Sequence, residues 1–382
     1  MEERMLRYIQ QREYLKPEDN ISRIAGRPAQ LIWGRRWETP PFVTIAIPAY
    51  RRQALLKQAL ESALGQVGFE EYQILIVDDS PLQEGESSET EAMIREYADD
   101  RILYYRNPEN LGLMDNWNMC YYLSRSPWVC TLHDDDSLPQ NFLAKMCAVV
   151  KKYPQMDALF NLAHQFDGTQ CTPQMQKELT RPVAERKVQI RAQKFWRQNF
   201  GFAAGRITGS FIRREAFVGA GGFGVDHFPG GRDILYNDDY CLAVRLFANY
   251  RCYILPQNIY NYRTGDNNGS ARVKDYLPDI VQEYYLGRKI SETKCILWRW
   301  IFFKRNKYQT VRNARRLDAL VRSGSERMNR EARVDFQELQ RACGWKTLEC
   351  SPLGMRLTDA FWKGYSLCRR ALETVYSHTI IC

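Results

Sequence analysis

Short runs of apolar, often β-branched residues alternate with segments of helical periodicity in the first 140 residues of this chain. Such runs predict strands when turn residues bound them, and here they predict strands at residues 42–48, 72–77, 101–105 and 128–132. Apolar residues at helical spacing predict helices between them, the first ending before Gly65 and the others at residues 91–98 and 114–123. This alternation is typical of a doubly wound α/β sheet.

Polar and aromatic residues stand where three of the predicted strands end. Tyr50 follows the strand that Pro48 closes, Asp79 follows the second strand, and three consecutive carboxylates, Asp134–Asp136, follow the fourth. In doubly wound sheets ligands bind at the carboxyl ends of the strands. The sequence therefore predicts a ligand site at this edge of the sheet.

The three adjacent carboxylates need a compensating positive charge if they lie near the core, because like charges repel and burial disfavours the ionised form. A divalent cation can supply that charge, since Mg²⁺ or Mn²⁺ prefers a few carboxylate oxygens together with the phosphates of a substrate. A solvated acidic turn is the alternative. We therefore expect either a site for Mn²⁺ or Mg²⁺ or an exposed turn at Asp134–Asp136.

The composition, 45% hydrophobic and 13% aromatic over 382 residues, is that of a chain with a packed core. Eleven cysteines occur without a Cys-x-x-Cys pair, which argues against a disulfide scaffold or a zinc knuckle and for reduced thiols. No apolar stretch has the length of a membrane span, and the charged first residues lack the apolar core of a secretion signal. We expect a cytoplasmic protein.

Positive charge is concentrated in the last third of the chain. Residues 271–382 carry 22 lysines and arginines against 12 acidic residues, whereas the first 270 residues are almost neutral. Aromatic residues and cations interleave in this helical region, among them Trp298, Trp300, Phe302, Phe303 and Trp362. Two interpretations stay open: helices that pack with a basic outer face, or peripheral binding to an anionic surface on the inner face of the cell membrane.

The same patterns divide the chain into three parts. We expect an N-terminal arm at residues 1–40, a catalytic domain at residues 41–270 and a basic, aromatic-rich helical region at residues 271–382. Two common phosphate-binding motifs are absent, the G-x-G-x-x-G turn after the first strand and the G-x-x-x-x-G-K-[ST] loop. Their absence argues against a dinucleotide oxidoreductase and a P-loop NTPase.

A series of ordered motifs resembles the inverting GT-A glycosyltransferases of family 2, of the polysaccharide-biosynthesis type. The motifs are Val43–Tyr50, Ile74–Ser80, Asn110–Gly112, Leu132–Asp136, Asn237–Arg245 and Tyr260–Arg263. The resemblance covers roughly residues 42–270. It implies a Rossmann-like mixed sheet flanked by helices, with a helical C-terminal extension. It also implies a metal-dependent enzyme that moves a sugar from a nucleotide-diphosphate sugar to a hydroxyl of a glycan or lipid-linked acceptor. We expect the donor to be a UDP-sugar.

The resemblance also implies roles for single residues. Tyr50 would stack on the nucleotide base and Asp79 would accept a hydrogen bond from it. Asp135 would face the ribose and Asp136 would bind the metal ion. Asp239 would be the general base that deprotonates the acceptor hydroxyl, and Arg263 would contact the diphosphate. Three more residues of these motifs are expected at the substrate: Pro48, Asp134 and Asp238.

The chain departs from the family pattern at three positions. His133 stands where the family's Asp-x-Asp motif usually begins with Asp, so Asp134 is an alternative metal ligand to Asp136. Either Asp238 or Asp239 can be the base, and the alignment of the residues that follow favours Asp239. Thr264 stands where a histidine often follows the closing arginine.

Two other functions stay open at this point. A sugar-phosphate nucleotidyltransferase would use a similar fold, but the glycine-rich, basic nucleotide loop of that class is missing. A nucleic-acid-binding protein would use the basic, aromatic tail, and would leave the carboxylates at the strand ends unexplained. We therefore expect no nucleic acid as a partner.

Overall fold

The structure is a computed structural model of the chain. It describes residues 3–27, 29–82, 88–167, 181–183, 191–193, 206–224, 238–264, 276–292, 296–323 and 334–346, with single positions at 174, 177 and 180 and several between 353 and 364. The chain divides into two compact units, Glu13–Arg272 and the combination of Met1–Arg12 with Val273–Cys382. The three-part division by sequence stays a prediction.

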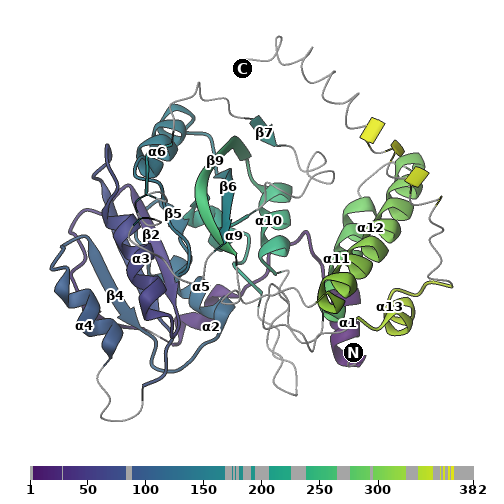
Figure 1. The fold of residues 1–382 in the computed structure, drawn as a ribbon, viewed down its shortest axis with the longest axis horizontal. Coiled ribbons are helices and arrows are strands. Elements are labelled where there is room, and N and C mark those ends of the chain that lie inside the picture. The colour runs from purple at the N-terminus through teal and green to yellow at the C-terminus, as the bar shows by residue number, and fades with distance from the viewer. Residues whose placement is uncertain are drawn as a thin grey trace. The chain divides into compact units, whose positions relative to one another are not determined.

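The larger unit is built on one mixed sheet (Figure 1). Among the described residues nine strands follow one another across it in the order β1-β4-β3-β2-β5-β8-β6-β9-β7. Their bounds are β1 Gln30–Trp33, β2 Val43–Ala49, β3 Tyr72–Asp78, β4 Ile102–Arg106, β5 Trp128–Thr131, β6 Ala158–Asp167, β7 Arg191–Gln193, β8 Phe211–Arg213 and β9 Cys252–Thr264. Strands β4, β3, β2 and β5 are parallel, and β8 runs antiparallel to both β5 and β6.

Helices cover both faces of this sheet. One hydrophobic cluster joins the sheet to α3 (Gln53–Leu64), α4 (Glu89–Glu96) and α6 (Phe142–Lys152). The other joins it to α2 (Ile21–Ala25), α5 (Leu113–Leu123), α9 (Arg214–Gly219) and α10 (Asp238–Asn249). Within β2, Ile45 and Ile47 belong to the first cluster and Ala46 to the second. Because both faces are covered, the central strands are apolar at almost every position.

The fold-class prediction is confirmed: a mixed α/β sheet is flanked by helices, and the described C-terminal part is helical. The four predicted strands lie within one residue of β2, β3, β4 and β5 at each end. The second half of the sheet was not predicted. Strand β9 contains Pro256, and its register against β6 shifts beside that residue. A proline and an irregular register both obscure the strand pattern.

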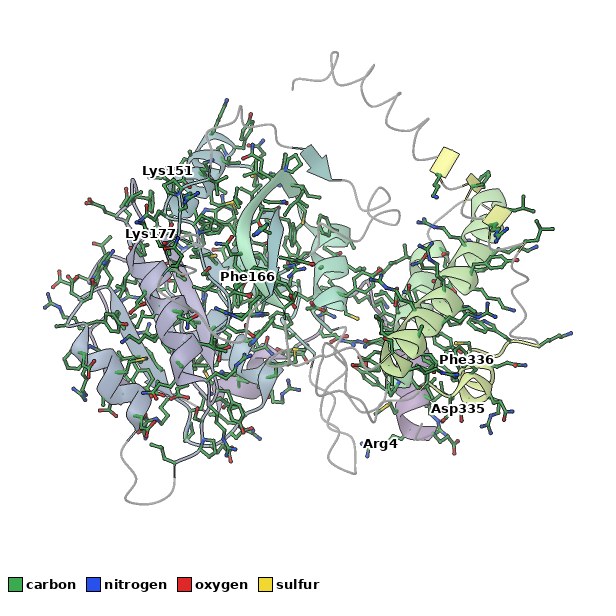
Figure 2. All side chains as sticks on the ribbon, viewed as in Figure 1. Arg4, Lys151, Phe166, Lys177, Asp335 and Phe336 are labelled. Atoms are coloured by element: carbon green, nitrogen blue, oxygen red, sulfur yellow. The ribbon has the colours of Figure 1, made fainter. Side chains whose placement is uncertain are left out.

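The smaller unit contains the helices α1 (Glu3–Gln11), α11 (Leu277–Glu292), α12 (Ile296–Arg322) and α13 (Phe336–Ala342). The hydroxyl of Tyr285 links three of them, because it accepts a hydrogen bond from Gln10 Nε2 and donates one to the carbonyl of Ala342. Asp335 caps α13 by accepting hydrogen bonds from two backbone N–H groups (Figure 2).

The predicted membrane-binding surface falls mainly outside the described side chains. Those of Trp298, Trp300, Phe302 and Trp362 are not described, and Phe303 is half-buried. Among the described helices, none combines the length and the apolar character that crossing a membrane requires. Peripheral binding to a membrane therefore stays a prediction.

Candidate active site

The carboxyl ends of three neighbouring strands meet at one edge of the sheet. Strand β2 pairs in parallel with β3 on one side and with β5 on the other. Tyr50 follows β2, Asp79 follows β3, and the acidic loop His133–Asp136 comes shortly after β5. Pro48 is buried inside β2 opposite Val77. The structure thus brings together the strand-end residues that the sequence singled out.

Asp79 is held by the loop after β4. Its carboxylate accepts hydrogen bonds from Asn107 Nδ2 at 2.8 Å and from the backbone N–H groups of Leu111 at 2.8 Å and Gly112 at 2.9 Å. Gly112 has a φ of +84°, a conformation that favours glycine. Burial raises the pKa of Asp79 to about 6, although these hydrogen bonds act in the opposite direction. The Asn110–Gly112 motif therefore cradles Asp79.

The three consecutive carboxylates have different partners. Arg52, just before α3, donates to both carboxylate oxygens of Asp134, with Nε 3.2 Å from Oδ2 and Nη2 bonded to Oδ1. Its Nη1 also donates to Asp135 Oδ2 at 2.6 Å. Burial raises the pKa of Asp134 to about 6, and the charge of Arg52 opposes this. Asp134 is therefore engaged by an arginine, and sequence reasoning assigned no role to Arg52 because the two residues are 82 positions apart.

Asp136 is fixed from strand β9. Its Oδ2 accepts a hydrogen bond from the hydroxyl of Tyr260 at 2.6 Å, and its Oδ1 accepts one from the backbone N–H of Arg263 at 2.7 Å. Its side chain is fully buried. Burial, with the charge of Asp136, raises the pKa of Tyr260, so the hydroxyl stays a donor. A substitution at Asp136 would remove a buried anchor as well as a candidate metal ligand.

Gly209 makes room for Tyr260. Its φ is +73°, and a Cβ at this position would lie 2.4 Å from the Tyr260 ring. The acidic loop is also tied to β9 by backbone hydrogen bonds between Ser137 and Asn261, 3.2 Å in each direction. Sequence reasoning assigned no role to Tyr260 or Gly209, because only the packing of β9 on the acidic loop reveals it.

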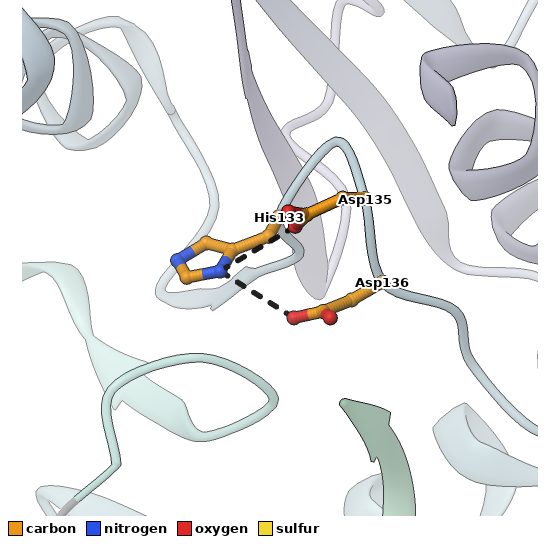
Figure 3. Close-up of side chains that lie close together, drawn as sticks. All are labelled: His133, Asp135 and Asp136. Atoms are coloured by element: carbon orange, nitrogen blue, oxygen red, sulfur yellow. Dashed lines mark ion pairs between the residues drawn. The ribbon is translucent and has the colours of Figure 1, made fainter. Parts of the chain in front are cut away.

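His133, Asp135 and Asp136 form a cluster of ligand atoms that could hold a metal ion, and this cluster is called the metal triad (Figure 3). The Nδ1 atom of His133 lies 3.4 Å from Asp136 Oδ2 and 4.0 Å from Asp135 Oδ1, and one ligand atom from each residue falls within 4.8 Å of the others. Among the described residues this is the only such cluster. One imidazole nitrogen with two carboxylate oxygens fits a divalent ion of the Mn²⁺ type. The Nε2 atom of His133 is buried and has no hydrogen-bond partner in the described part of the chain.

Arg263, on strand β9, contacts the acidic loop with its side chain. Its Nε donates to the carbonyl of Asp135 at 2.7 Å and its Nη2 to Gln58 Oε1 at 2.8 Å. Its guanidinium lies 4.7 Å from the ring of Phe166 on the neighbouring strand β6 (Figure 2). The side chain is buried, so in this structure the arginine positions the loop and places a positive charge beside the triad.

Asp239 begins helix α10 together with Asp238, whose side chain is not described. Asp239 is half-buried, and its Oδ1 accepts a hydrogen bond from the N–H of Tyr240 at 2.7 Å. Burial raises the pKa of Tyr262, and the charges of Asp136, Asp135 and Asp239 contribute in that order. Tyr262 therefore lies within electrostatic reach of both the triad and Asp239.

Helix α10 is anchored by Arg245. This arginine is fully buried, and its Nε donates to the carbonyl of Ala220 at 2.9 Å. A second nitrogen, Nη2, donates to the carbonyl of Gly222. The motif Asn237–Arg245 thus joins an acidic helix start to an arginine that fixes the helix against the turn after α9.

Sequence comparisons identify relatives over part of the chain. Residues 44–218 match the model of glycosyl transferase family 2. The chain is 34% identical over 98 residues to the uncharacterized protein MT1568 of Mycobacterium tuberculosis, and 26% identical over 130 residues to the uncharacterized glycosyltransferase MJ1057 of Methanocaldococcus jannaschii. These stretches cover 26% and 33% of this chain and 29% and 43% of the two relatives. The chain thus spans less than half of either.

A solved structure of S. aureus TarS, residues 1–349 in complex with UDP, aligns with a TM-score of 0.49 at 12% identity, over 85% of this chain and 92% of that one. The family match includes Tyr50, Asp79 and the metal triad, whereas Asp239 and Arg263 lie beyond its end. The family that the sequence motifs predicted is confirmed for the matched segment. Residues 44–218 of this chain, within the larger compact unit, match the glycosyl transferase family 2 model.

Proposed function

We propose that this chain is a metal-dependent inverting glycosyltransferase. It would move a sugar from a nucleotide-diphosphate sugar to a hydroxyl group of a glycan or a lipid-linked acceptor. The observation that supports this most is that Tyr50, Asp79 and the metal triad come together at the ends of three parallel strands inside the family 2 domain.

The donor nucleotide would lie along this edge of the sheet. Tyr50 is half-buried and offers a ring face for stacking on the base. Asp79 would accept a hydrogen bond from the base, and its cradle of three donors fixes the direction of its carboxylate. Pro48 would help to bind the nucleotide by shaping the end of β2 before Tyr50. Asp134 would help by holding Arg52 at the edge of the donor site.

Asp136, with Asp135 and His133 beside it, would hold the metal ion, and Asp135 would also face the ribose. A bound divalent cation stabilises the negative charge that grows on the leaving diphosphate. Tyr260 and the backbone of Arg263 keep Asp136 in place. Arg263 would hold the acidic loop in place through its hydrogen bond to the carbonyl of Asp135, and its positive charge would attract the diphosphate.

Asp239 would take the proton from the acceptor hydroxyl. Attack from the face opposite the leaving group inverts the anomeric carbon and needs a single carboxylate base. Asp239 is half-buried and stands in the first turn of α10, where the helix dipole favours a carboxylate. Asp238 would assist in binding the acceptor.

Calorimetry with UDP and GDP, each with and without Mn²⁺, tests the donor site. We expect at least one nucleotide to bind more tightly with Mn²⁺ by tenfold or more, and Asp135→Asn to remove most of this gain. Asp100→Asn, at an exposed position away from the site, is the matched control and should keep it. Binding that is independent of Mn²⁺ and equal in all three proteins would contradict the proposal.

The acceptor proposal extends to the cell surface. A lipid-linked acceptor in surface polysaccharide synthesis would suit an enzyme whose basic C-terminal region binds anionic lipid. Co-sedimentation with vesicles of anionic or neutral lipid tests this. We expect binding that needs the anionic lipid, weakens with salt and is lost when residues 276–382 are removed. If the protein does not sediment with anionic vesicles at low salt, the C-terminal region does not bind the membrane, and the acceptor is then expected to be soluble.

A further inference from the structure

The acidic loop begins with His133, so the candidate metal site contains an imidazole nitrogen beside its carboxylate oxygens. We propose that His133 is a metal ligand and that it makes the site select a transition-metal ion, Mn²⁺ in particular, over Mg²⁺. The proposal rests on the proposed function only in taking the triad as the place where a metal binds.

The geometry of the triad suits shared coordination. Ligands bound about 2.1 Å from one ion are about 3 Å apart when adjacent and about 4.2 Å apart when opposite. His133 Nδ1 lies 3.4 Å from Asp136 Oδ2 and 4.0 Å from Asp135 Oδ1. Shifts below about 1 Å would therefore bring the three atoms around one ion.

The remaining carboxylate oxygens of the loop are engaged elsewhere. Arg52 binds both oxygens of Asp134 and the Oδ2 of Asp135, which leaves Asp135 Oδ1 on the side of His133. Asp136 Oδ2 accepts one hydrogen bond from Tyr260, and a carboxylate oxygen has a second lone pair for a metal. The pairing with Arg52 thus engages Asp134 and leaves Asp135 Oδ1 toward the imidazole, while Tyr260 and the backbone N–H of Arg263 orient Asp136.

The imidazole is held in this orientation from helix α5. The ring centroids of His133 and Trp117 are 4.6 Å apart at an angle of 47°, and Trp117 is buried. Figure 3 shows Nδ1 facing the two carboxylates and Nε2 on the far side of the ring. A ring that is packed in place loses little freedom when its nitrogen binds a metal.

The donor set decides the preference between ions. Mg²⁺ takes carboxylate, phosphate and water oxygens and dehydrates reluctantly, whereas imidazole nitrogen suits ions of the first transition series. Two carboxylates keep the site acceptable to Mn²⁺, and the single nitrogen weakens binding of Mg²⁺ more than binding of Mn²⁺. An aspartate at position 133 would give three carboxylates and lose this discrimination.

Electron paramagnetic resonance of Mn²⁺ tests the proposal without turnover. The full chain is titrated with Mn²⁺ in the presence of UDP, and bound Mn²⁺ is examined for coupling to an imidazole nitrogen. We expect the coupling in the wild type, its loss in His133→Asp and its retention in His164→Asn, a control at an exposed position of β6. The Mg²⁺ concentration that displaces half of the Mn²⁺ should fall about tenfold in His133→Asp.

The outcomes separate this proposal from the proposed function. Mn²⁺ that binds the wild type without nitrogen coupling would overturn the role of His133 and leave a carboxylate metal site intact. A displacement ratio unchanged in a folded His133→Asp protein would overturn the selectivity. No binding of Mn²⁺ to the wild type with UDP present would contradict the metal dependence of the proposed function as well. Because the coupling is measured in the wild type, the test does not depend on folding of the variant.

Discussion

Arg52 and Asp134 form a two-point ion pair, in which Nε lies 3.2 Å from Oδ2 and Nη2 donates to Oδ1. Asp134 is 2% exposed, so its charge depends on this partner. Arg52 thus binds both oxygens of Asp134 and one oxygen of Asp135, and the other oxygen of Asp135 and one of Asp136 lie on the side of His133. A loop with three adjacent acids can therefore be buried and still leave carboxylate oxygens available for a candidate metal site.

Replacing Arg52 should destabilise the fold. Arg52→Ala leaves Asp134 buried without its counter-ion, and we expect a loss of about 3 kcal/mol in the free energy of unfolding. Urea unfolding at pH 7 measures it. Arg51→Ala is the control, because Arg51 is exposed and its guanidinium only lies over the Tyr50 ring; it should cost about 0.5 kcal/mol. Equal losses in the two variants would show that the ion pair contributes little.

Removing the hydroxyl of Tyr260 should loosen Asp136. Tyr260→Phe keeps the ring and deletes the donor at 2.6 Å, so we expect a loss of about 2 kcal/mol in stability and weaker binding of Mn²⁺ to the same protein. Tyr253→Phe, on the same strand with a half-buried ring, is the matched control. If the two variants bind Mn²⁺ equally well, Tyr260 does not position a metal ligand.

A side chain at position 209 should disturb the same contact. Gly209→Ala places a Cβ 2.4 Å from the Tyr260 ring in a backbone conformation that alanine disfavours, so we expect a loss above about 2 kcal/mol. Gly26→Ala is the control, because its φ is −81° and no atom lies within 4 Å of the added Cβ. The melting temperature compares the two. A Gly209→Ala protein as stable as Gly26→Ala would contradict the packing described here.

Asp79 should give the stability of the protein a pH dependence. Burial raises its pKa from an ordinary value of 3.8 to about 6, so between these values the folded chain binds more protons than the unfolded chain. The free energy of unfolding should then fall as pH rises from about 4 to about 6, by at most about 3 kcal/mol from this group.

Asp79→Asn cannot titrate, so it should lack this component of the pH dependence. Unfolding of the wild type and of Asp79→Asn in urea from pH 4 to pH 8 measures the difference between them. That difference should change up to about pH 6 and stay constant above it. Curves that run parallel over the whole range would show that the pKa of Asp79 is not raised.

Asp239→Asn should lower the rate of sugar transfer and not the affinity for the donor. The amide keeps the shape of the side chain but cannot take a proton, so we expect a loss of about 10²–10⁴ in kcat. Steady-state kinetics with a defined acceptor measures it, and calorimetry checks the donor affinity. A comparable loss in Asp238→Asn, with none in Asp239→Asn, would move the role of base to the neighbouring residue.

The sequence predicted the part of the site that depends on local pattern. Apolar runs that end in Tyr50, Asp79 and Asp134–Asp136 reveal strand ends, because the carboxyl ends of parallel strands meet at one edge. The partners of these residues depend on distant segments. Arg52 precedes Asp134 by 82 residues, and Tyr260 follows Asp136 by 124, so no local spacing predicts either contact.

Nucleotide release from a panel of sugar nucleotides, with and without Mn²⁺, tests the central claim most directly. We predict that at least one UDP- or GDP-sugar yields free nucleoside diphosphate, that release needs a divalent cation, and that Asp135→Asn reduces it by at least tenfold while Asp100→Asn does not. No release from any sugar nucleotide, or release that neither Mn²⁺ nor Asp135→Asn affects, would contradict the account.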